Sequence, residues 1–192
     1  MPEITEVFYP RTRSDWRTWL ANHYQTKTEV WLQLFRKDSG RPTLAYDDLV
    51  EECLCFGWID GVVKKYDADS RVQRITPRRK KSFLSELNRQ RVWKLQHQGL
   101  LLPGADAMIQ DQIGDPADPL VIPDWIAERL REDDQVWAQF QAFSHFYQRL
   151  KVGWIAESGL RMEVARQRLD YLVRMTSQGK QYGTQPLRGL FY

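Results

Sequence analysis

The stretch from Asp47 to Lys81 constrains the fold more than any other part of the chain, because its hydrophobic period changes from helix to strand within it. Residues 46–56 show apolar side chains at helical spacing, and Gly57 suits the C-terminal end of a helix. Residues 58–66 and 71–76 alternate as two strands that a polar turn joins into a hairpin. The basic run TPRRKK then ends the hairpin. We therefore expect a helix, a hairpin and a basic corner in that order.

The helix over 46–56 has two stripes of opposite character. Its inner stripe consists of Leu49, Val50, Cys53 and Leu54. Four acids form the outer stripe: Asp47, Asp48, Glu51 and Glu52. Because apolar stripes face the core, the acids are predicted to lie on the opposite side of the helix.

The N-terminal residues predict more of the same unit. A first strand ends near Phe8, and Ser14 is the expected N-cap of a helix over 15–23. Large apolar residues occupy both faces of the strand 29–37, which places that strand in the middle of a sheet. A long helix follows the basic corner, starting at Ser82 or Ser85 and ending near Gln98.

The second half of the chain shows only helical patterns. Residues 100–123 are mostly a connection that contains four prolines, and a short helix is possible within it over 105–112. Four further helices are predicted over 124–131, 134–143, 146–157 and 160–177. The predicted fold class is α+β, with a small sheet flanked by helices in the N-terminal part, followed by an all-helical C-terminal part. We expect the units to span 1–115 and 120–180, with a tail over 181–192.

Composition excludes several classes of protein. A content of 42% hydrophobic and 28% charged residues is typical of a globular protein, and no apolar run approaches the roughly 18 residues of a membrane span. The N-terminus lacks the apolar stretch of a signal peptide, so a cytoplasmic location is expected. The two cysteines, Cys53 and Cys55, point to different helix faces and are expected to stay reduced. No nucleotide or hydrolase motif occurs, so we predict no cofactor.

Metal binding is not predicted. The three histidines, at positions 23, 97 and 145, are far apart in the sequence, and no recognised ligand spacing includes them. A metal held by both sulfurs of Cys53 and Cys55 would require a distorted helix.

Charge is distributed unevenly, although the net charge is only +3. Residues 64–81 contain eight basic residues against Asp67 and Asp69, a balance of +6. Residues 105–135 contain nine acids against Arg129 and Arg131, a balance of −7. In one interpretation, the protein has a positive surface that is suited to anions. In the other, the two charged blocks face each other or face water.

The central stretch also carries a family resemblance. Thr43 and Tyr46 precede the helix, CFGWIDG follows it over 55–61, and QR, TPRR and KS follow at 73–74, 76–79 and 81–82. With EVWLQLFRKDSG and Trp154-Ile155, this pattern resembles the bacterial YdeI/OmpD-associated (bacteriocin-protection) family. Phe83 keeps an aromatic residue that the family usually has, whereas Ile75 departs from one. The resemblance implies a bacterial cytoplasmic protein of α+β fold and no particular reaction.

The basic corner is the first candidate site. Arg78 and Arg79 could bind phosphate or carboxylate through forked hydrogen bonds, and Lys80 would add positive potential. A helix N-terminus just beyond the corner also favours an anion, and Ser82, Ser85 and Asn88 could add neutral hydrogen bonds. Alternatively, Arg78 pairs with Glu51 or Glu52 of the preceding helix and has a structural role. Residues placed nearby are Lys65, Arg74 and Trp58.

Asp60 is the second candidate, because a partly desolvated carboxylate on a strand could act as general acid or base. Gly57 and Gly61 would let a ligand or another backbone approach it closely. Tyr46 could donate a proton to the same reaction, although a buried, structural Tyr46 is the alternative. The structural alternative for Asp60 is an ion pair with Lys64, Lys65 or Arg74.

These candidates lead to three functional hypotheses. The leading one is a non-enzymatic stress-protection protein that binds a small anionic ligand or an acidic protein surface. The second is an enzyme that acts on a small anionic substrate through Asp60 and Tyr46. The third is a nucleic-acid-binding module, in which Trp58, Tyr66 and Phe83 would stack on bases.

Overall fold

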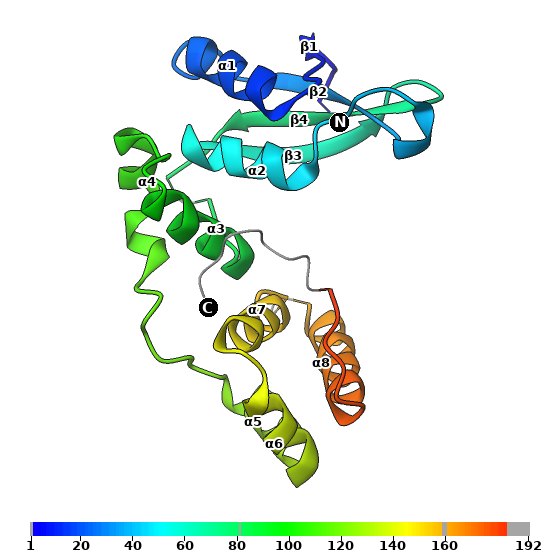
Figure 1. Ribbon diagram of the computed structural model, residues 1–192, viewed down its shortest axis with the longest axis vertical. Helices are drawn as coiled ribbons and strands as arrows, with labels where there is room; N and C mark the ends of the chain where they lie inside the picture. The colour runs from blue at the N-terminus through cyan, green and yellow to red at the C-terminus, as the bar shows by residue number, and fades with distance from the viewer. Residues whose placement is uncertain (1, 81, 159–160, 184–192) are drawn as a thin grey trace. The chain divides into compact units, whose positions relative to one another are not determined.

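The computed structural model describes residues 2–80, 82–158 and 161–183 (Figure 1). Its backbone contacts divide the chain into a first unit, Met1–Ser82 with Leu95–Gln112, and a second unit, Phe83–Lys94 with Ile113–Tyr192. The predicted fold class is confirmed, since strands occur only in the N-terminal half of the described chain and helices alone follow. The predicted boundary between 115 and 120 stays a prediction. Lys81 and most of the predicted tail lie outside the described residues.

The first unit contains a four-stranded sheet in the order β1-β2-β4-β3. Its strands are β1 (Val7–Phe8), β2 (Val30–Phe35), β3 (Trp58–Lys65) and β4 (Ser70–Pro77). β1 runs parallel to β2, and β4 pairs antiparallel with both β2 and β3. The predicted hairpin is therefore confirmed, and β2 lies inside the sheet as its two apolar faces indicate (Figure 1).

Helices α1 (Arg13–His23) and α2 (Tyr46–Cys55) lie side by side and pack on the sheet (Figure 1). Trp16 and Leu20 of α1 are fully buried, and the indole Nε1 of Trp16 donates to the Leu49 carbonyl of α2 at 3.3 Å. A 3-10 turn, η1 (Lys37–Ser39), precedes α2, and α4 (Pro103–Ile113) completes the unit. The large rings and the inner stripe of α2 thus form one core.

The predicted N-cap of α1 is wrong by two residues. Thr12, and not Ser14, caps the helix, because its hydroxyl accepts from the Asp15 N–H at 3.1 Å. The Asp15 carboxylate in turn accepts from the Thr12 N–H at 3.0 Å. This reciprocal capping box satisfies two backbone donors, whereas Ser14 at the cap would have placed Arg17, a cation, in the position of Asp15.

Gly57 ends α2 in the left-handed region, with φ of 71°. A Cβ at this position would meet Ala105 of α4 at 3.5 Å. The glycine is therefore required by its backbone conformation, and the close neighbour that it faces is α4 of the same unit.

Every regular element among the described residues of the second unit is a helix. Its helices are α3 (Glu86–His97, whose last three residues group with the first unit), α5 (Asp124–Arg131), α6 (Asp134–Ala142), α7 (His145–Ala156) and α8 (Met162–Ser177). Each lies close to its predicted range, although the predicted start of α8 at Leu160 lies outside the described residues. The core of this unit consists of Ile126, Leu130, Val136, Phe140, Phe143, Tyr147, Val152, Ile155, Leu169 and Leu172.

Candidate functional site

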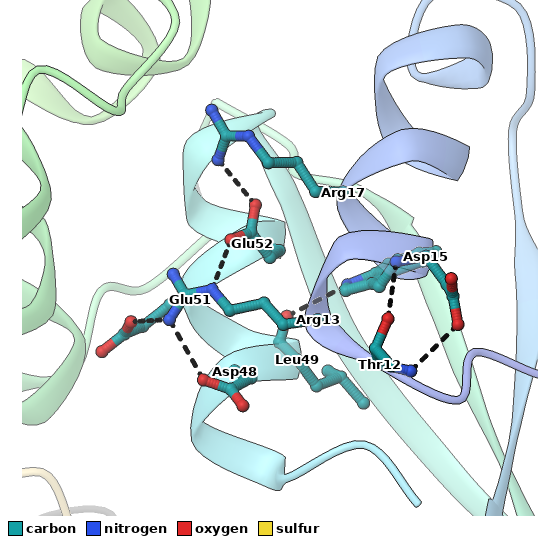
Figure 2. A network of polar contacts seen from close by, with 9 residues as sticks. Thr12, Arg13, Asp15, Arg17, Asp48, Leu49, Glu51 and Glu52 are labelled. Atoms are coloured by element: carbon teal, nitrogen blue, oxygen red, sulfur yellow. Dashed lines mark hydrogen bonds and ion pairs between the residues drawn. The ribbon is translucent and has the colours of Figure 1, made fainter.

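The acids of α2 are bound by two arginines of α1 (Figure 2). Arg13 donates from Nε to Glu52 at 2.6 Å and from Nη1 to Glu51 at 2.8 Å and to Asp48 at 3.0 Å. Arg17 binds the second oxygen of Glu52 at 2.8 Å. Arg13 and Arg17 lie one helical turn apart on α1, so both side chains reach the same face of α2.

This network corrects the prediction that Glu51 and Glu52 lie on the outer stripe. Their exposed fractions are 3% and 1%, because α1 covers them and supplies the opposite charge. Burial by itself would lower the pKa of Arg13, but the hydrogen bonds and attraction of Glu52 and Glu51 raise it above its ordinary value. The arginines that meet these acids come from α1 and were missed in the sequence, where only their i,i+4 spacing could have indicated them.

Asp60 lies on β3 and is held by neutral donors. The Tyr46 hydroxyl donates to Asp60 Oδ2 at 2.8 Å, and Gln73 Nε2 donates to the same oxygen at 2.9 Å. Gln73 is buried, whereas Tyr46 is 49% exposed, so the interpretation of Tyr46 as a buried core residue is wrong. The structure therefore unites Tyr46 with Asp60, and it adds Gln73, which sequence reasoning missed.

The cations expected to hold Asp60 are placed elsewhere. Arg74 binds Glu29 through Nε at 2.7 Å, and hydrogen bonds from Thr5 and then Arg74 lower the pKa of Glu29. The Lys64 ammonium contacts the Pro2 carbonyl and lies 5.2 Å from the centre of the Trp31 ring. Within the described part of the chain Asp60 forms no ion pair. The alternative role, an ion pair with Lys64, Lys65 or Arg74, is therefore not seen.

The basic corner separates a buried arginine from two exposed cations. Arg78 is 5% exposed, and its Nη2 donates to the Ser82 carbonyl at 3.1 Å. Burial lowers the pKa of Arg78, while the charge of Asp60 opposes that change. The Ser82 hydroxyl accepts from the Arg79 N–H at 3.1 Å, and the Ser82 N–H donates back to the Arg79 carbonyl at 2.8 Å. Ser82 thus closes the turn that presents Arg79 and Lys80 to solvent.

Two other predicted ligand residues lie apart from the corner. Lys65 is paired with Arg71 at the turn end of the hairpin, whereas Trp58 is paired with Pro77 at the corner end. Seven residues along a strand separate the two ends by roughly 23 Å. Trp58 is 1% exposed and donates to the Tyr24 carbonyl at 3.3 Å, so its ring faces the core. Lys65 and Arg79 therefore cannot contact one small ligand together.

The N-terminus of α3 carries an anion from the same unit. The Glu157 carboxylate at the end of α7 accepts from the Glu86 N–H, and the Ser85 hydroxyl accepts from the Asn88 N–H at 3.3 Å. Burial raises the pKa of Glu157, and the hydrogen bond from the Glu86 backbone opposes that rise. The sequence analysis expected an external anion at this helix end; in the structure a carboxylate of the same unit accepts from its first N–H group.

Within the described residues, no helix has the length and apolar character that crossing a membrane requires. The described residues also contain no group of three or more His, Cys, Asp or Glu side chains that could hold a metal ion. No curated protein and no solved structure matches the chain.

Two family models match successive parts of the chain. Residues 119–179, which contain α5 to α8, match the model described as Bacteriocin-protection, YdeI or OmpD-Associated, so the resemblance to that family is confirmed over this segment. The central stretch with GWIDG and TPRR falls within the other match, over residues 8–107. Because that match covers more than half of the 192 residues, the chain belongs to the family described as Domain of unknown function (DUF8412) and carries a YdeI/OmpD-associated segment at 119–179.

Proposed function

We propose that this chain is a non-enzymatic binding protein of the bacterial cytoplasm, with a stress-protection role, that receives an anionic ligand or an acidic protein surface at the basic corner. The observation that carries the proposal is the state of Arg79 and Lys80. Both side chains are exposed, and in the described ranges neither forms an ion pair. Their positive potential is therefore available to an anion from outside.

The network between α1 and α2 supports this role. Both oxygens of Glu52 accept hydrogen bonds from Arg13 and Arg17, and Glu51 accepts from Arg13. These acids were the expected internal partners of the corner. α1 binds them, and in the described part of the chain neither acid forms an ion pair with Arg79 or Lys80.

We assign different roles to the residues of the corner. Arg78 is buried and contacts the Ser82 carbonyl, so its role is to hold the turn. Arg79 and Lys80 would make the direct contacts, one through a fork of hydrogen bonds and the other through a point charge. Lys65 and Arg71, at the far end of the hairpin, would contribute only to an extended acidic partner.

A matched pair of double variants tests the proposal. Retention on immobilised phosphate is expected to fall at least about fivefold for Arg79→Ala/Lys80→Ala, since each lost exposed contact is worth on the order of 1 kcal/mol. The control Arg11→Ala/Lys37→Ala removes the same charge from exposed residues outside the corner. Equal losses in the two variants would mean that only net charge matters, and the corner would not be a site. Retention of mixed oligonucleotides with a steep salt dependence would instead favour the nucleic-acid hypothesis.

A second candidate function rests on the hydrogen bond between Tyr46 and Asp60. An enzyme acting on a small anionic substrate requires these two groups to meet, and Asp60 Oδ2 accepts from both Tyr46 and Gln73. Turnover of phosphorylated or carboxylated metabolites, followed by NMR, is expected to disappear in Asp60→Asn if this candidate is right. Turnover that survives in Asp60→Asn, or none in the wild type, would rule it out.

A further inference from the structure

The side chain of Lys151 on α7 is enclosed by aromatic rings. Its Nζ lies 3.8 Å from the ring centre of Tyr182, 5.2 Å from that of Tyr147 and 5.6 Å from that of Trp154. Lys151 is only 5% exposed. In the described part of the chain no carboxylate pairs with it and no acceptor receives a hydrogen bond from it. A buried lysine without a counter-ion is rare, because an uncompensated charge loses its hydration.

Among the residues that the structure describes, no negative group near the cage compensates the ammonium. Arg168 of α8 lies over the Trp154 ring at 4.2 Å and donates to the Trp154 carbonyl and the Ser158 hydroxyl. Arg168 is therefore a second cation close to the cage. The neighbouring titratable groups are phenols: Tyr147, Tyr171 and Tyr182.

The phenols of Tyr147 and Tyr182 are neutral near pH 7. Burial raises the pKa of both Tyr147 and Tyr182, and among the described residues the buried Tyr182 hydroxyl has no hydrogen-bond partner. The rings attract the ammonium through their π faces, but they offer no negative charge. Burial therefore disfavours the ammonium relative to the neutral amine, and it lowers the pKa of Lys151 to about 8.

Tyr182 and Gly183 follow α8 and cover the amine. The Tyr182 N–H donates to the Tyr147 hydroxyl at 3.3 Å, which ties this segment to α7. A Cβ at Gly183 would lie 3.4 Å from Lys151 Nζ, so the Gly183 backbone lies close to the amine.

We propose that Lys151 is a covalent site for small aldehydes, at which the amine enclosed by Tyr147, Trp154 and Tyr182 forms an imine. The lone pair of the neutral Nζ attacks the carbonyl carbon, and a C–N bond forms while the C=O π bond opens. Both protons of the amine end on the carbonyl oxygen, which leaves as water when the C=N bond forms. No oxidant or reductant is consumed. The apolar rings suit an aldehyde with an apolar or aromatic substituent, which would pack where water is excluded.

Reductive trapping in the native wild-type protein tests this site. The protein is incubated with benzaldehyde and cyanoborohydride over a range of pH, and the labelled fraction of each lysine is measured by peptide mass spectrometry. With a pKa of about 8, roughly one Lys151 in ten is neutral near pH 7, a few hundred times the fraction of an exposed lysine. We expect Lys151 to be labelled at least tenfold faster than the exposed Lys80, with a pH midpoint about two units lower.

Two controls keep the outcome clear. In concentrated guanidinium chloride both lysines should react alike, because the cage is lost. The Lys151→Met variant preserves an apolar side chain in the cage and should lose only the fast label. Slower labelling of Lys151 than of Lys80 in the native protein, or a shared pH midpoint, would overturn the proposal. So would a fast label that persists in Lys151→Met.

Discussion

The two units bury charged groups in opposite ways. In the first unit, Glu51 and Glu52 are almost fully buried, and arginines of α1 bind them directly. In the second unit, Lys151 is equally buried, and aromatic rings surround it in place of a carboxylate. Paired charges of the first kind hold two helices together, whereas a buried amine without an anion changes its protonation. Burial by itself therefore does not distinguish a structural charge from a reactive one, and the identity of the neighbours does.

The largest expected effect comes from removing a paired carboxylate of the first unit. Glu52→Ala leaves Arg13 and Arg17 facing each other across an empty position, so we expect the free energy of unfolding to fall by about 4 kcal/mol. Urea denaturation measures this loss. Asp48→Ala is the control, since Asp48 binds the same Arg13 but its side chain is 37% exposed, and its loss should be below about 1 kcal/mol. Similar losses in both variants would contradict the comparison.

The next effect concerns the unpaired region and depends on pH. Below pH 8 Lys151 is protonated in both folded and unfolded protein. Between about 8 and 10.5 the unfolded chain holds the extra proton, so stability rises with pH through this window by up to about 3 kcal/mol. The rise is read as the difference between wild type and Lys151→Met, because buried thiols and phenols titrate in the same range. A difference that is flat from pH 7 to 11 would show that the amine remains charged when buried.

Packing next to the cage gives a third, smaller effect. A Cβ at Gly153 of α7 would lie 2.5 Å from the Glu86 Cβ of α3, so Gly153→Ala is expected to destabilise the protein by about 2 kcal/mol. Gly104→Ala in α4 is the matched control, since nothing lies within 4 Å of its Cβ position. The melting temperatures of the two variants are compared by thermal unfolding. If Gly153→Ala leaves the melting temperature unchanged, α3 and α7 can move apart easily at this contact.

The smallest effect sharpens the description of Asp60, a carboxylate held by neutral donors. Tyr46→Phe removes the hydrogen bond to Asp60 Oδ2, and we expect a loss of less than about 1 kcal/mol because Tyr46 is half-exposed. The control is Tyr66→Phe, at a tyrosine of similar exposure in the turn between β3 and β4, which should change nothing. A double-mutant cycle with Asp60→Asn measures the coupling, and coupling near zero would remove Tyr46 from the site.

Some sequence predictions rested on local rules and were confirmed. The helix over 46–56 and the hairpin after it follow from hydrophobic period and from Gly57, which act within a few residues. The cap of α1 follows from another local rule. Thr12 and Asp15 form the capping-box pattern, which satisfies two backbone donors and is therefore favoured over a single cap at Ser14.

Other predictions depended on partners far away in the sequence. The helical period correctly separated the acids of α2 from its apolar stripe, but it cannot tell whether that second stripe meets water or another helix. Arg13 reaches Glu52 across 39 positions, and Gln73 reaches Asp60 across the hairpin. Neither contact has a local signature.

The sequence by itself determined the order of helices and strands, the α+β class and the place of the basic corner, because these depend on side-chain period and turn chemistry over short distances. Only the tertiary structure decided which charges are neutralised: α1 binds the acids of α2, Glu157 meets the N-terminus of α3, and in the described ranges Lys151 meets aromatic rings and no carboxylate. Electrostatic partners are selected by distance in space, and the chain must fold before those distances exist.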